Sequence, residues 1–148
     1  MNNGSTDKAA RPRNIGRSML ALLAGFVAAV VLSLGTDFGL HAVGVWPALG
    51  QPMSAQLLLL ATVYRTIYGV ISAYIVARLA PRRLLEHALI GGAIGMVLSI
   101  GGAVATWNRG LGPHWYPVAL IFVALPSAWV GGRLRLTYLE RQATVGTP

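Results

Sequence analysis

Four long apolar stretches, separated by short polar segments, make up most of the chain. The first carries no charged residue from Ser18 to Thr36, and the third carries none from Ala88 to Asn108. A helix rises about 1.5 Å per residue, so about 20 apolar residues cross a hydrocarbon core of about 30 Å. The pattern predicts an all-α membrane protein with a four-helix transmembrane domain at 15–141, its helices at about 18–44, 53–80, 84–106 and 116–136.

Proline and glycine mark the segments between these stretches. Pro81 is expected to end the second helix, and Pro126 is expected to kink the fourth, because proline lacks the amide that an inner helical turn uses. Residues 1–14 are polar and non-periodic, which predicts a disordered cytoplasmic tail. A C-terminal tail is expected at 142–148.

Composition supports the membrane assignment. Of the 148 residues, 55% are hydrophobic and 11% are charged, whereas soluble domains carry about 25% charged residues. The net charge is +8, but the arginines stand singly at the ends of apolar stretches, so we expect no nucleic-acid binding. The chain has no cysteine, which excludes disulfides and cysteine-ligated metal sites.

The basic residues also predict an orientation. Of the 12 Lys and Arg residues, all but Arg65 and Arg109 lie in the N-terminal segment, near the second-to-third connector, or at the end of the fourth helix and beyond it. Cytoplasmic loops concentrate Lys and Arg. We therefore expect both termini in the cytoplasm, and the arginine bias favours a bacterial cytoplasmic membrane. The opposite rim would carry an aromatic belt of Trp46, Trp107, Trp115 and Tyr116.

Small residues recur at helical spacing, as in helices that pack closely in lipid. Gly25, Ala29 and Ser33 are four residues apart in the first helix, and Gly91 and Gly95 form a GxxxG motif in the third. These faces are expected to fill the bundle interior. The third helix could also bind a second copy of the chain or another membrane protein.

Two charged residues, Asp37 and Arg65, lie well inside apolar stretches, where charge is expensive. We expect them to pair, with Tyr68 and Ser33 beside the pair and His41 one turn above Asp37 on the same face. The pair either fixes helix order or belongs to an outward-facing pocket for a small polar molecule or a lipid headgroup. The candidate residues of that pocket are Asp37, His41, Arg65, Tyr68, His114 and Trp115.

These residues do not make a catalytic set, so we expect no catalytic residue, metal site or cofactor. The sequence favours a non-enzymatic membrane module or accessory subunit within the lipid bilayer. One alternative is a small oligomeric transporter or channel that uses the pocket around Asp37 and Arg65. The other is an outer-face membrane enzyme that acts on a lipid or a quinone.

Overall fold

The computed structural model describes residues 15–48 and 50–145, and within these ranges the chain is helical and has no strand. Each of its four helices is long and apolar enough to cross a membrane, which confirms the expected architecture. The expected tail at 1–14 and the end of the C-terminal tail lie outside the described residues. The helices are α1 (Ile15–Ala42), α2 (Ala55–Leu79), α3 (Leu84–Thr106) and α4 (Trp115–Val145).

Residues next to α2 determine where the helix begins and ends. Ser54 is its N-cap, and the Ser54 hydroxyl oxygen accepts a hydrogen bond from the Leu57 amide at 3.4 Å. Ala80 is extended because the ring of the following proline, Pro81, disfavours a helical conformation there.

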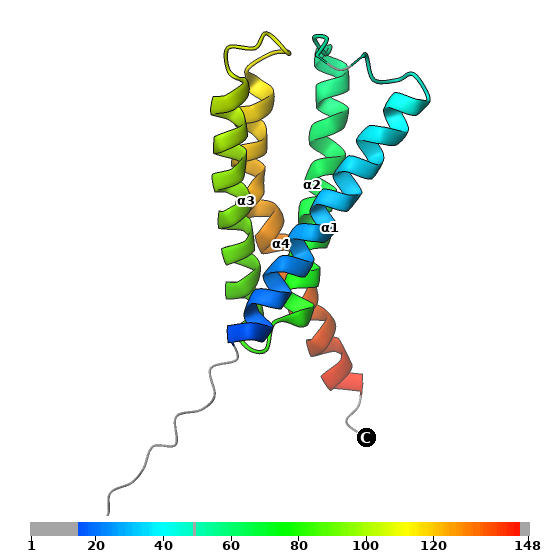
Figure 1. Ribbon diagram of the computed structural model, residues 1–148. Coiled ribbons are helices and arrows are strands. Elements are labelled where there is room, and N and C mark those ends of the chain that lie inside the picture. Colours follow the sequence, from blue (N-terminus) through cyan, green and yellow to red (C-terminus); the bar gives the residue numbers. More distant parts are fainter. Residues whose placement is uncertain (1–14, 49, 146–148) are drawn as a thin grey trace, which may run out of the picture.

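The fourth helix is longer than predicted. It continues to Val145 instead of ending near 136, so much of the expected C-terminal tail is helical. Pro126 lies inside α4 without ending it. Residues 137–145 contain no proline or glycine, and Gln142 donates to the Tyr138 hydroxyl one turn earlier. At 31 residues, about 45 Å, α4 exceeds the hydrocarbon thickness, and its last turns project from the bundle in Figure 1.

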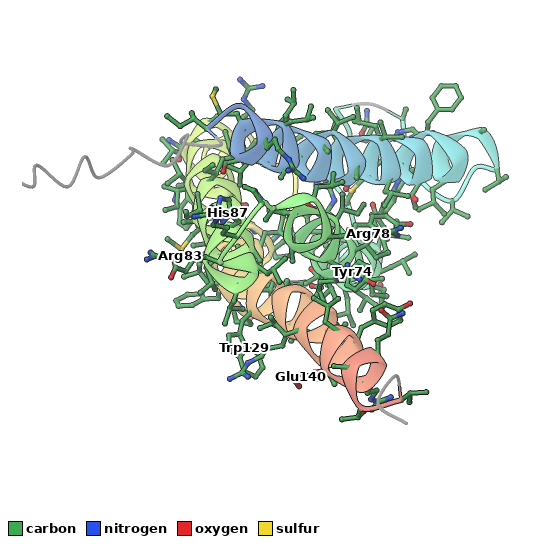
Figure 2. All side chains as sticks on the ribbon, turned by 90° about the horizontal axis from the view of Figure 1, so that it is seen from below. Tyr74, Arg78, Arg83, His87, Trp129 and Glu140 are labelled. Atoms are coloured by element: carbon green, nitrogen blue, oxygen red, sulfur yellow. The ribbon has the colours of Figure 1, made fainter. Side chains whose placement is uncertain are left out.

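The helices alternate in direction, so both described ends of the chain lie at one end of the bundle, the termini end (Figure 1). The two long connectors, 43–54 and 107–114, lie at the other, the connector end. Seen from below, α2 occupies the middle of the bundle (Figure 2). It packs against the other three helices, whereas α1 does not contact α4.

Packing differs between the two ends. Toward the termini end, the core is a cluster of small side chains that lets helices approach closely: Ala73, Ala77, Ala88 and Ala128. Gly131 continues this contact, because a Cβ atom added there would overlap the main-chain oxygen of Val70 on α2.

Toward the connector end, the core is aromatic. Trp46 packs with Ala61 and Tyr64, and Tyr68 and Tyr116 lie against them. Trp46 is 5% exposed, so its predicted place in an exposed belt is wrong. The amides of Val45 and Trp46 bond the carbonyl oxygen of Leu40, which turns the connector back over the bundle.

The first helix is held to its neighbours at defined points. Near the termini end, His87 Nε2 of α3 lies 2.9 Å from the Ser18 hydroxyl. Further along, the Ser72 hydroxyl of α2 donates to the Gly25 carbonyl oxygen at 2.7 Å. Toward the connector end, α1 stays beside α2 and moves away from α3 (Figure 1).

Candidate functional site

A polar pair joins α1 to α2 in the half of the bundle near the connectors. Arg65 Nη2 donates to Asp37 Oδ2 at 2.6 Å. The side chains keep 35% and 23% of their surface exposed, for Arg65 and Asp37 respectively. Arg65 lies ten residues after Ala55, about 15 Å along the axis of α2. The pair is therefore accessible at a depth where unpaired charge is expensive.

Tyrosines of α2 complete the junction, in a different way from the one expected. The Tyr64 hydroxyl donates to Asp37 Oδ1, so each carboxylate oxygen has a partner. The Tyr68 hydroxyl instead lies 2.7 Å from Thr36 Oγ1, one residue before Asp37. The expectation that Tyr68 binds the pair is wrong, and Tyr64 is the residue that sequence reasoning missed.

The spacing of Tyr64 could have identified it, because Tyr64 is four residues before Tyr68 and so shares its face of α2. Its ring packs at 5.6 Å from that of Tyr68.

His41 lies one turn above Asp37, as its spacing predicted. Its Nδ1 atom is 3.0 Å from the Asp37 carbonyl oxygen, which can only accept, so Nδ1 carries the proton. When the ring is neutral, this tautomer leaves Nε2 as an acceptor. This atom is enclosed and has no hydrogen-bond partner within the described residues.

An open cavity of about 820 Å³ adjoins the pair. We call it the polar-pair cavity. Its lining is mainly apolar, with Leu34, Phe38 and Leu58 among the wall residues, and its polar side chains come from three helices and a connector. These polar side chains are Asp37, His41, Trp46, Arg65 and Tyr116.

A second cavity, of about 240 Å³, lies between all four helices and is called here the central cavity. Small residues line much of it, including Ala29 of α1 and Gly95 of α3. Four of its lining residues are serines: Ser33, Ser72, Ser99 and Ser127. Arg65 lines this cavity as well as the polar-pair cavity, so one guanidinium side chain borders both.

The remaining two candidates lie at the connectors, away from the ion pair. His114 Nε2 is 3.0 Å from the carbonyl oxygen of Trp107, and the two rings pack at 4.5 Å with a tilt of 39°. Trp115 meets Tyr116 edge to face at 6.2 Å. His114 and His41 both line a third cavity of about 240 Å³ beneath the connectors. The structure thus groups Asp37, Arg65 and His41 at one cavity, brings His114 to a second cavity that it shares with His41, and places Trp115 in neither.

Among residues 15–48 and 50–145, no group of three or more His, Cys, Asp or Glu side chains could hold a metal ion. No protein family, curated protein or solved structure matches the chain. Functional inference therefore rests on the geometry of the polar pair, its two cavities and the surfaces of the helices.

Proposed function

We propose that this chain is a non-enzymatic membrane module that serves as an accessory subunit in a larger membrane assembly. In this proposal α3 packs against a helix of a partner membrane protein. The module lies in a bacterial cytoplasmic membrane with both ends in the cytoplasm.

The observation that carries this proposal is a glycine face on α3 that the chain covers only in part. Gly91, Gly95 and Gly102 are four and seven residues apart and share one side of the helix. A Cβ atom added at Gly91 would contact Leu22 at 3.6 Å and Val76 at 3.7 Å. At Gly95, which lines the central cavity, and at the exposed Gly102 it would meet nothing within 4 Å.

The course of α1 explains this difference. It covers the α3 glycine face near the termini end and then moves away from α3 (Figure 1). Membrane helices associate through close packing of small residues, because lipid provides no hydrophobic drive between them. The exposed end of the face at Gly102, beyond the central cavity, is therefore suited to a partner helix.

The contacts of the histidine and serine side chains favour a non-enzymatic role. His41 and His114 each place a ring nitrogen against a main-chain carbonyl oxygen. The hydroxyls of Ser72 and Ser127 donate to main-chain carbonyl oxygens of Gly25 and Val123. Only the Ser72 contact joins two helices, and the other three are local, but each of these groups is engaged by the main chain.

The proposed orientation rests on charge. Arg17, Arg78, Arg82 and Arg83 cluster at the termini end, and α4 adds Arg141 beyond its membrane-spanning length. The 107–114 connector carries Arg109 alone. This asymmetry favours the termini end as the cytoplasmic side.

The accessory role is tested by purification from native membranes in mild detergent at native expression level, followed by native mass spectrometry. We expect one membrane protein in fixed stoichiometry with the chain. Gly102→Leu fills the uncovered face and should remove most of the bound partner.

Gly101→Leu is the matched control, because Gly101 is also open but lies about 100° around the helix. It should leave the complex intact. A monomer, a complex of this chain with itself alone, or equal losses from both variants would contradict the accessory role.

A transporter is the second candidate, favoured by the position of Arg65 between the polar-pair and central cavities. With the serines of the central cavity, Arg65 would form part of a polar path. This candidate predicts a pH-dependent flux in proteoliposomes that Asp37→Asn abolishes. Absence of flux across ions and amines would remove it.

A further inference from the structure

The polar-pair cavity has the size and lining of a small-molecule site. Its volume of about 820 Å³ lies within the range of about 300–1,000 Å³ typical of such sites, which are mostly apolar with a few placed polar groups. Here Leu34, Phe38 and Leu58 supply apolar wall, and Arg65 and Tyr116 supply polar groups from α2 and α4.

The polar side chains that line the cavity include hydrogen-bonding atoms that have no partner. Tyr64 and Arg65 occupy both oxygens of Asp37, and the ion pair carries no net charge. The described residues contain four enclosed polar side-chain atoms without a hydrogen-bond partner, and three belong to side chains that line this cavity. These three are Arg65 Nε, Trp46 Nε1 and His41 Nε2.

The three atoms differ in what they need. Arg65 Nε and Trp46 Nε1 are donors that need acceptor oxygens, whereas His41 Nε2 of the neutral ring carries a lone pair that needs a donor. Trp46 is 5% exposed, so its unpaired N–H is held inside the protein. Because all three atoms are enclosed, a ligand reaches them only with a small rotation of these side chains.

The extent and the lining of the polar-pair cavity favour a flat and largely apolar ligand. Arg65 lies about 15 Å along α2, and the cavity extends from there to Trp46 in the connector. Trp46 and Tyr116 line the cavity, and Tyr64 packs beside them, which provides aromatic surface for a flat ring.

We propose that the polar-pair cavity binds a quinone-class lipid, a neutral ring with carbonyl or hydroxyl oxygens and an apolar tail. The ring oxygens accept from Arg65 and Trp46, and a hydroxyl of the reduced ring donates to His41. The tail follows the apolar wall toward lipid. This binding site goes beyond the accessory role, since it uses α1, α2 and α4 whereas the partner contact uses α3.

Trp46 provides the test, because a bound quinone quenches the fluorescence of an adjacent indole. The chain has four tryptophans, so changing Trp107, Trp115 and Trp129 to Phe leaves Trp46 as the reporter. The full chain in lipid nanodiscs is titrated with a short-chain benzoquinone. We expect saturable quenching of Trp46.

The variant Asp37→Asn with Arg65→Gln keeps the pair neutral and should weaken the quinone at least about tenfold, since it replaces the guanidinium donors. Arg78→Gln, at the termini end of α2, is the matched control and should not change the titration. If the double variant does not fold, Arg65→Lys keeps the positive charge beside Asp37, removes the Nε donor and should weaken binding by a factor of about three.

Two outcomes would overturn the proposal. One is quenching that rises linearly with quinone and equally in the parent and the variants, which is partition into the membrane only. The other is a Trp46 response that saturates with monoacylglycerol or phosphatidylglycerol and not with the quinone. Neither outcome depends on whether a partner protein binds α3.

Discussion

Asp37 of α1 and Arg65 of α2 form a 2.6 Å ion pair, the one pair between different helices within residues 15–48 and 50–145. Toward the connector end α1 moves away from α3 (Figure 1), and the contacts of Asp37 with Tyr64 and Arg65 join α1 to α2. The pair thus ties this part of α1 to the middle helix of the bundle.

Removing one partner of the ion pair should lower the free energy of unfolding more than removing both partners. Asp37→Leu leaves the Arg65 charge without a partner within the membrane and should destabilise by about 2–3 kcal/mol. The double variant with Arg65→Leu removes both charges and should cost about 1 kcal/mol or less. Thermal unfolding in mild detergent measures this cycle, and costs that simply add would show that the two side chains do not interact.

The three tyrosines of α2 should differ when each loses its hydroxyl. Tyr64→Phe removes a donor from Asp37 and should destabilise by about 1–2 kcal/mol. Tyr68→Phe removes the contact with Thr36 and should cost about 0.5–1 kcal/mol. Tyr74→Phe is the control and should be neutral. Equal unfolding midpoints for all three would refute the assigned contacts.

Close packing of α4 on α2 makes Gly131 sensitive to size. Gly131→Ala places a methyl group against the main chain of Val70 and should destabilise by about 1–3 kcal/mol or prevent folding. Gly101→Ala adds the same methyl group in open space, where alanine favours the helix. Folded yield and unfolding midpoint distinguish the two, and equal tolerance would contradict the packing of α4.

The orientation can be measured directly, because the chain has no cysteine of its own. Gln51→Cys and Asn108→Cys should react with a membrane-impermeant maleimide added outside intact cells. Arg82→Cys and Gln142→Cys should react only after the cells are permeabilised. The reverse pattern would place both ends outside.

The spans could be predicted from sequence because bilayer thickness sets the length of an apolar helix. Asp37 and Arg65 were identified for a related reason, since charge within such a helix needs compensation. Neither inference requires knowledge of how the helices pack.

Features that depend on packing could not be predicted. Tyr64 and Arg65 are about 100° apart around α2, and both reach Asp37 only because of where α1 lies on α2. Trp46 is buried because its connector folds back onto Leu40, a contact that no local pattern indicates. The partly uncovered glycine face of α3 likewise follows from the course of α1, which long-range contacts determine.

The accessory role depends on what lies against that glycine face in the native membrane. A photoreactive amino acid at position 102, with position 101 as the control, tests this by crosslinking in intact cells. We predict one discrete protein adduct from position 102 and none from position 101. Lipid adducts alone from both positions would contradict the proposed function.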